Sequence, residues 1–333
     1  MIAPSKWHAV ARSRAVRDKP LRVVVDGEPL VLFRAGDGLR CLLDRCPHRF
    51  APLSGGRIVA GQIECPYHGW RFDGAGRCRL MPGLYDDIPT VAVPTRPVCE
   101  RGCLVFVSHA SDPGEPYLGA LSGPDVVTAT VESRVRARLL DVAENILDAT
   151  HTHFTHKSIL RGLSSRRYRV HVTVTGGEGW VEARYEGEPR QEGLISRLLE
   201  GERSISVGRF VAPASGTQGI AELEFWGQGR INLATTFHLR QEYADTVHGF
   251  GVLAGPRQGG LGHVKAALFK PFFRIALKQD QRILEAATDN RRAFGATRPV
   301  VTALDVLRPH IEAILDGRRP AVADAPVKMT MEL

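Results

Sequence analysis

The sequence predicts an α+β protein of two domains, an N-terminal antiparallel β-sandwich and a C-terminal antiparallel sheet with covering helices. Short segments rich in valine and leucine, separated by turns, fill the first third of the chain. A stretch rich in serine, aspartate, proline and glycine follows at residues 111–123, and we expect the domain boundary there, between residues 1–112 and 113–333. Beyond it, segments of alternating hydrophobicity lie between helical patterns.

Turn sequences separate the predicted strands of the first domain. Residues 21–25 and 30–33 are predicted to form a hairpin, because Asp26-Gly27-Glu28-Pro29 between them is typical of a turn. Frequent glycine and proline between short strands favour a compact antiparallel sandwich. Further strands are expected at residues 39–43, 62–65, 70–72 and 103–107.

The second domain is predicted to begin with a helix and to end with two. Hydrophobic spacing indicates helices at residues 139–149, 263–292 and 302–316. Alternation of apolar and polar residues predicts the strands of a sheet between them, at residues 169–175, 180–185, 205–211, 220–226, 232–239 and 247–253.

The composition is that of a globular protein without a nucleic-acid-binding arm. Of the 333 residues, 43% are hydrophobic and 24% charged, and the net charge of +8 is spread without a block of five or six like charges. The first 17 residues lack the apolar core of a secretory signal, and no uncharged apolar run reaches the roughly 18 residues that cross a bilayer. We therefore expect a cytoplasmic protein, in which spaced cysteines indicate metal ligands before disulfides.

Cys46-Pro47-His48 and Cys65-Pro66-Tyr67-His68 each place a cysteine and a histidine in one short turn. Two thiolates and two imidazoles could bind a tetrahedral zinc ion. They could also bind a Rieske [2Fe-2S] cluster, with both cysteines on one iron and both histidines on the other. The inner spacings of one and two residues are tight for a zinc fold and favour the cluster. The remaining cysteines are expected to be small core residues: Cys41, Cys78, Cys99 and Cys103.

A second group of possible ligands follows the predicted helix at residues 139–149. Asp148 and His151 are three residues apart and share a helix face, whereas His151 and His156 need a helix end or a π-like turn to meet. Two histidines and a carboxylate form the facial triad of non-haem Fe(II) oxygenases. Asp280, on the predicted helix 263–292, is the candidate carboxylate. The alternatives are that these acids are surface charges, or that the ligand is Glu285, Asp289 or Glu242.

Together these motifs resemble the oxygenase component of the Rieske non-haem iron oxygenases, of the vanillate and dicamba O-demethylase type. In that family Asn-x-x-Asp-x-x-His-x-x-x-x-His carries the iron histidines, and this chain matches it with Asn145, Asp148, His151 and His156. Asp280, followed by Leu284 and Glu285, matches the motif of the carboxylate. The resemblance implies a helix-grip-like C-terminal domain, a [2Fe-2S] cluster on Cys46, His48, Cys65 and His68, and a mononuclear Fe(II) on His151, His156 and Asp280.

The resemblance also implies how the two centres cooperate. The family forms ring-shaped homotrimers, in which the residue matching Asp148 bridges a cluster histidine, here His68, to an iron histidine, here His151, between neighbouring subunits. His153 has no ligand role in the family pattern. Electrons come from a separate reductase, with or without a ferredoxin, because the sequence carries no nicotinamide or flavin fingerprint.

The expected function is that of an O₂-dependent monooxygenase that hydroxylates, oxidatively demethylates or desaturates an apolar or aromatic small molecule. The alternatives are a Rieske electron carrier with a non-catalytic ligand-binding domain and a zinc-stabilised interaction module. Arg209 and His238, on predicted strands, are candidate substrate-binding residues. The basic amphipathic stretch at residues 263–280 is expected to be a lid or a packing helix rather than a peripheral membrane contact, because Pro271 interrupts its pattern.

Overall fold

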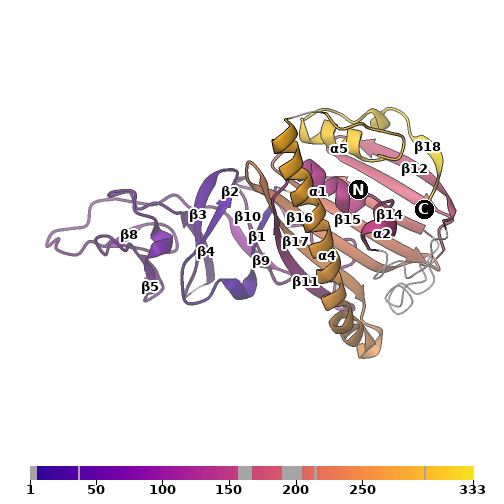
Figure 1. Ribbon diagram of the computed structural model, residues 1–333. Coiled ribbons are helices and arrows are strands. Elements are labelled where there is room, and N and C mark those ends of the chain that lie inside the picture. Colours follow the sequence, from indigo (N-terminus) through magenta and orange to yellow (C-terminus); the bar gives the residue numbers. More distant parts are fainter. Residues whose placement is uncertain (1–5, 37, 157–166, 190–204, 214–215, 296–297) are drawn as a thin grey trace. The chain divides into compact units, whose positions relative to one another are not determined.

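Three small antiparallel sheets form the N-terminal unit, which ends at Pro116 (Figure 1). The computed structural model describes residues 6–36, 38–156, 167–189, 205–213, 216–295 and 298–333 of the chain. The sheets are β1-β10-β9, β2-β3-β4 and β5-β6-β7-β8. Their strands are β1 His8–Arg12, β2 Leu21–Val25, β3 Glu28–Ala35, β4 Gly38–Leu43, β5 Arg57–Val59, β6 Gln62–Glu64, β7 Arg71–Phe72, β8 Cys78–Leu80, β9 Val98–Arg101 and β10 Leu104–Val107.

The predicted hairpin between β2 and β3 is confirmed, but its turn is shorter than expected. Asp26 and Gly27 have φ values of 49° and 78°, the left-handed pair that a two-residue hairpin turn requires. Glu28 and Pro29 therefore belong to β3, where Glu28 pairs with Val25. The short turn fixes the direction of the Asp26 side chain.

The cysteines outside the two metal motifs lie at different depths. Cys41 is buried in the core, and burial raises the pKa of its thiol to about 12. Cys78 and Cys99 are half-buried. Cys103 is exposed, with φ of 68°, in the turn between β9 and β10, so the expectation of a core position is wrong for this residue.

A single eight-stranded antiparallel sheet forms the centre of the C-terminal unit, which begins at Tyr117. Its order is β11-β17-β16-β15-β14-β13-β12-β18. Neither edge strand, β11 or β18, is indicated by the sequence pattern. The strands are β11 Val126–Val135, β12 Arg169–Gly177, β13 Trp180–Glu186, β14 Ile205–Val211, β15 Gln218–Gly227, β16 Arg230–Tyr243, β17 Thr246–Pro256 and β18 Val327–Glu332.

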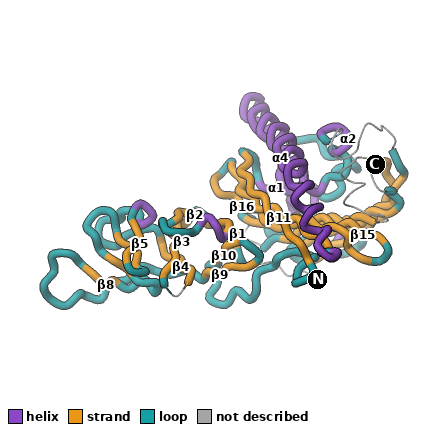
Figure 2. The backbone as a smooth tube through the Cα atoms, turned by 90° about the horizontal axis from the view of Figure 1, so that it is seen from below, coloured by secondary structure: helices purple, strands orange, loops and turns teal. Residues whose placement is uncertain are grey.

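Helices cover one face of this sheet, which confirms the predicted α+β class. Figures 1 and 2 show the long helix α4 crossing the sheet on the side of β11 and β17. Phe269 and Phe273 of α4 pack on the sheet beside Leu253. The α-helices are α1 Leu139–Leu147, α2 Thr152–Thr155, α4 Leu261–Phe294 and α5 Arg308–Leu315, and the 3₁₀ helices are η1 Ser13–Ala15, η2 Leu53–Gly55, η3 Gln258–Gly260 and η4 Ala321–Ala323.

Helix α4 is continuous through Pro271, so the expected interruption of the pattern is absent from the backbone. Pro271 lies on the exposed side of the helix, where water can replace the hydrogen bond that proline cannot donate. Because Phe269 and Phe273 pack on the sheet, the segment at residues 263–280 is part of a packing helix. Among the described helices, none is long and apolar enough to span a membrane.

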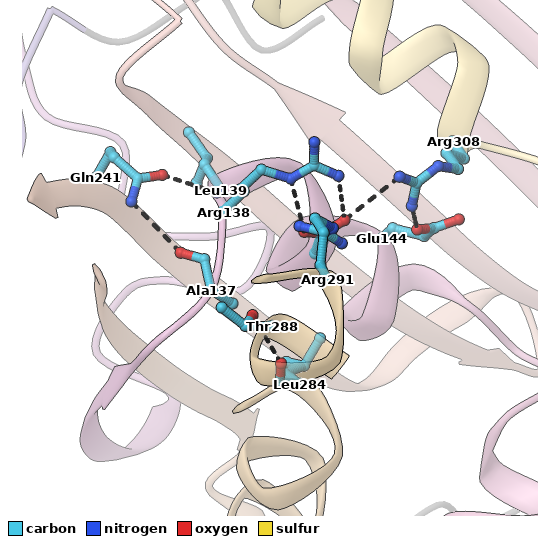
Figure 3. A network of polar contacts seen from close by, with 10 residues as sticks. Ala137, Arg138, Leu139, Glu144, Gln241, Leu284, Thr288, Arg291 and Arg308 are labelled. Atoms are coloured by element: carbon cyan, nitrogen blue, oxygen red, sulfur yellow. Dashed lines mark hydrogen bonds and ion pairs between the residues drawn. The ribbon is translucent and has the colours of Figure 1, made fainter. Parts of the chain in front are cut away.

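A buried carboxylate joins α1 to the two C-terminal helices (Figure 3). Asp141 of α1 accepts hydrogen bonds from Arg138 at 2.9 Å, from Arg291 of α4 at 2.9 Å and from Arg308 of α5 at 3.3 Å. Burial opposes charge on Asp141, but the guanidinium groups of Arg138 and Arg291 outweigh it and hold the pKa of the carboxyl below its usual value. Arg308 also contacts Glu144, which adds a second link between α1 and α5.

Replacing Asp141 by asparagine tests this link. The amide leaves three neighbouring arginines without their common counter-charge, so the free energy of unfolding is expected to fall by about 3 kcal/mol. We expect this loss of stability to lie at the low end of the range for broken buried ion pairs, because the side chain of Arg138 is partly exposed to solvent. Denaturant unfolding measures the change.

The matched control is Asp316→Asn, which removes an exposed pair with Arg318 and is expected to cost less than about 1 kcal/mol. Equal losses in the two variants would contradict the central role of Asp141.

Candidate metal centres

Two loops of the N-terminal unit repeat the same backbone hydrogen bonds around a cysteine. The N–H of Cys46 donates to the carbonyl of Ala51 at 2.9 Å, and the carbonyl of Cys46 accepts from Phe50 at 2.9 Å. In the second loop, the N–H of Cys65 donates to Trp70 at 2.8 Å and its carbonyl accepts from Gly69 at 3.1 Å. The loops that follow β4 and β6 are therefore structural copies of one another.

A left-handed residue closes each loop at the same position. Phe50 has φ of 61° and Gly69 has φ of 71°. A Cβ atom at Gly69 would lie 3.1 Å from Cγ of Pro82. Both the left-handed backbone and this close packing therefore favour glycine at this position. At Phe50 the side chain extends into solvent instead.

The four predicted ligands separate by type within this pair of loops. Cys46 and Cys65 are buried, whereas His48 and His68 are exposed, with ring centroids 4.5 Å apart. This separation fits a Rieske cluster, which takes both thiolates on one iron and both imidazoles on the other. Burial raises the pKa of Cys46 to about 11, so the metal-free thiol holds a proton that a bound metal ion would displace.

Aromatic groups hold the two histidines in place. His48 stacks on Trp70, with ring centroids 4.6 Å apart and planes 2° from parallel. Tyr67 stacks on His68 with centroids 3.9 Å apart. Partial desolvation, together with the charges of His48 and Arg49, lowers the pKa of His68 and favours the neutral imidazole that binds a metal.

The second group of ligands meets at the end of a helix. Helix α1 ends at Leu147, and the one-turn helix α2 carries His151 as its N-cap and His156 as its C-cap. Their rings lie edge to face with centroids 5.2 Å apart. His151 and His156, five residues apart, therefore meet at a helix end, as their spacing predicts.

Asp280 of α4 reaches both of these histidines. Its Oδ1 lies 3.1 Å from Nε2 of His156 and 3.5 Å from Nε2 of His151. Nε2 of His151 and Oδ1 of Asp280 are buried and make no hydrogen bond within the described residues. Three donor atoms within 4.8 Å of one another, two of them buried without a hydrogen bond, fit a metal ion, and two imidazoles with one carboxylate are the donors of the facial triad.

The alternative carboxylates are engaged elsewhere. Glu285 accepts from the backbone N–H of Arg136 at 3.3 Å, and Asp289 accepts from the guanidinium of Arg136 at 3.0 Å. Glu242 pairs with Arg134 at 2.8 Å.

Hydrogen bonds at Nδ1 orient both histidines of this group. Nδ1–H of His151 donates to the carbonyl of Asp148 at 2.8 Å, and Nδ1–H of His156 donates to Oε1 of Gln279 at 2.9 Å. Each bond leaves Nε2 as the metal-facing nitrogen. Gln279 is not among the residues predicted from the sequence, and the signal that could have found it is its place directly before Asp280 on α4.

Asp148 lies beside this group without reaching its centre. Its Oδ1 accepts the N–H and the hydroxyl of Thr150, both at 2.7 Å, and its Oδ2 is 3.5 Å from Nδ1 of His151. Burial opposes charge on His151, but contacts with Asp148 and Asp280 outweigh it and raise the pKa of the metal-free imidazole to about 9. Asn145 lies on α1, half-buried, one turn before Asp148.

Arg209 and His238 lie on the other face of the sheet. Their neighbours Phe210 and Phe237 belong to the helix-covered core, and side chains alternate along a strand. The guanidinium of Arg209 contacts Glu182 at 2.6 Å, Glu224 at 3.0 Å and Glu222 at 3.3 Å. Burial lowers the pKa of His238 to about 4 and keeps it neutral. Both side chains point away from the face that carries the histidine pair, so they do not line that group.

Comparisons with known proteins match both units. Residues 6–94 match the model of the Rieske [2Fe-2S] domain, and residues 135–317 match that of the vanillate O-demethylase oxygenase C-terminal domain. The dicamba O-demethylase oxygenase component of Stenotrophomonas maltophilia is 34% identical over 52% of this chain and 53% of that protein. The chloroacetanilide N-alkylformylase oxygenase component of Rhizorhabdus wittichii is 37% identical over 48% of each.

The alignments with these curated relatives therefore span about half of their length. The crystal structure of dicamba monooxygenase bound to 3,6-dichlorosalicylic acid superposes with a TM-score of 0.75 at 25% identity. That match covers 93% of this chain and 95% of the solved one.

Replacing Gln279 by leucine tests the orientation of His156. Without its acceptor the imidazole is free to rotate, so the dissociation constant for ferrous ion at this group is expected to rise about 10- to 100-fold. The EPR signal of the ferrous–nitrosyl complex, which the [2Fe-2S] cluster does not give, measures occupancy.

Gln281→Leu is the control, since Gln281 contacts Arg134 and Glu285 and neither histidine. Unchanged ferrous-ion binding in the Gln279 variant would remove its positioning role.

Proposed function

Because this chain belongs to the family of Rieske oxygenases with the vanillate O-demethylase oxygenase C-terminal domain, we propose that it is the oxygenase component of an O₂-dependent oxidoreductase. It hydroxylates, oxidatively demethylates or desaturates an apolar or aromatic small molecule. The observation that carries the proposal is the meeting of His151, His156 and Asp280. A plain electron carrier has no need of such a group.

In this proposal two separate sets of side chains bind the two metal centres. Cys46, His48, Cys65 and His68 hold the [2Fe-2S] cluster, which supplies single electrons. His151, His156 and Asp280 hold a mononuclear ferrous ion, which supplies oxygen activation at its open positions. Gln279 and the carbonyl of Asp148 keep the two imidazoles aimed at that ion.

Electrons enter from a separate reductase, with or without a ferredoxin. The exposure of His48 supports this route, because it leaves part of the imidazole side of the cluster open to a partner even where His68 meets the neighbouring copy. Phe50 and Tyr67, which flank them, are 67% and 57% exposed and add apolar surface of the kind found in protein contacts.

The working form is a homotrimer in which Asp148 joins the two centres of neighbouring copies. Asp148 would contact His68 of the partner subunit and so connect it to His151. Two features support this role: the side chain of Asp148 is 30% exposed, and its Oδ2 is 3.5 Å from Nδ1 of His151. Asn145, one turn earlier on α1, is a positioning residue for Asp148. The cytoplasmic location also stays a prediction.

The substrate is apolar or aromatic in this proposal. The sheet face that α1 and α4 cover is apolar, and Phe237 of β16 faces Phe273 of α4 with ring centroids 5.8 Å apart. Such a face favours burial of an uncharged molecule over a charged one.

Metal and sulfide analysis separates the three candidate functions. The oxygenase is expected to hold about three irons and two sulfides per chain, the carrier about two of each, and the interaction module zinc without sulfide. The measurement uses protein reconstituted without oxygen. Absence of the third iron would remove the oxygenase, and product formed with O₂ consumed, with a surrogate reductase, identifies the substrate.

Asp148→Asn tests the connection between the centres. The neutral amide cannot serve two imidazole N–H groups as the carboxylate can. Iron and sulfide content should therefore be unchanged, while product formed per cluster oxidised falls about 10- to 100-fold.

The control is Asp289→Asn, which removes a carboxylate of α4 that pairs with Arg136, away from the histidines. Full coupled turnover in the Asp148 variant would overturn its assignment.

A further inference from the structure

Outside the two metal centres, the N-terminal unit brings His8, Asp26 and His109 together. Their donor atoms lie within 4.8 Å of one another. Nε2 of His8 is 3.5 Å from Oδ2 of Asp26, and Nδ1 of His109 is 3.4 Å from the same oxygen. We propose that these three side chains form a zinc site.

The backbone of three separate elements builds this group. His8 begins β1 and pairs with Val107 of β10, and His109 follows two residues later. Asp26 occupies the left-handed first position of the β2–β3 turn, with φ of 49°. Strand pairing and a two-residue turn therefore place His8 and Asp26, and His109 lies only two residues beyond the end of β10.

The distances fit a tetrahedral ion. With metal–nitrogen and metal–oxygen bonds of about 2.0–2.1 Å, neighbouring ligand atoms lie about 3.3–3.4 Å apart. The two nitrogen–oxygen distances, 3.5 and 3.4 Å, are close to that value. The two nitrogens lie within 4.8 Å, and a small rotation of His109, whose side chain is 34% exposed, closes that gap.

A further carboxylate orients His109. Its Nε2–H donates to Oε2 of Glu28 at 3.1 Å, which leaves Nδ1 for the metal. Arg96 holds Glu28 in turn with two hydrogen bonds, of 2.7 and 2.9 Å. A carboxylate that hydrogen-bonds the far nitrogen of a ligand histidine is the usual support of a zinc site.

The donor set and its exposure define the ion. Two imidazoles and one carboxylate suit a transition-metal ion, among which zinc takes the tetrahedral geometry that these distances fit, whereas magnesium and calcium take oxygen ligands. Only the side chain of His8 is nearly buried, at 6% exposed, while Asp26 and His109 keep 28% and 34%. The fourth position is therefore open to water or to a small ligand. The bound ion ties β1 to the segment that follows β10.

Zinc binding to the iron-loaded chain tests the proposal. The chain is equilibrated with chelator-buffered zinc, its metal content is measured, and X-ray absorption at the zinc edge reports the ligands without interference from iron. We expect one zinc per chain, bound by nitrogen and oxygen, with the iron content unchanged. Three outcomes would each contradict the site: the absence of stoichiometric zinc, the presence of sulfur ligands on the zinc, or the loss of one iron for each zinc gained.

Variants assign the zinc to these residues. His109→Ala and Asp26→Asn are expected to lose it, while Glu28→Gln keeps the ligands and binds zinc about 10- to 100-fold more weakly. His171→Ala, at an exposed histidine of β12, is the control and should bind normally. An unchanged cluster EPR signal shows that the same unit is still folded. Normal zinc binding by the His109 and Asp26 variants would refute the assignment.

Discussion

The carboxylate of Asp141 accepts hydrogen bonds from arginines at the ends of two other helices, and the candidate iron group depends on that contact. Asp148 and His151 follow α1, whereas Gln279 and Asp280 arrive on α4. Arg291 lies three turns beyond Asp280 on the same helix. The contact of Arg291 with α1 therefore also fixes the position of Asp280 along the axis of α4 and its direction around that axis. Because α4 is continuous from Asp280 to Arg291, the buried ion pair of Asp141 can hold Asp280 in position without contacting it.

The two metal groups are built in different ways. The cysteine–histidine loops follow β4 and β6, strands of two different sheets in one small unit, and a repeated pair of backbone hydrogen bonds shapes each loop. Local chain geometry therefore determines most of the arrangement of the cysteines and histidines. The histidine–aspartate group joins residues 124 positions apart, and its third ligand is in place because α4 packs across the sheet through Phe269 and Phe273. Its geometry depends on the tertiary core.

Several elements could be read from the sequence because their pattern is strong. The strand at Ile205–Val211 was predicted with its bounds, and the helix that begins at Leu139 was two residues too long. The edge strands β11 and β18 were missed. Val126–Val135 mixes four valines with threonine, glutamate, serine and arginine without a strict alternation, and such a pattern is weak. Pro271 does not interrupt the helix, because an exposed proline can remain inside a long helix whose other face is packed.

The sequence by itself determined the candidate ligands of both groups, because such chemistry demands fixed residue types at short spacings. These candidates are Cys46, His48, Cys65, His68, His151 and His156. It could nominate Asp280 but could not exclude Glu285, Asp289 or Glu242, since all four are acids without a local constraint. The tertiary structure decided between them, because helix packing and the arginine partners settle which carboxylate stands before the histidines. It also placed Arg209 and His238 on the far face of the sheet and supplied Gln279, since contacts between distant segments leave no spacing in the chain to read.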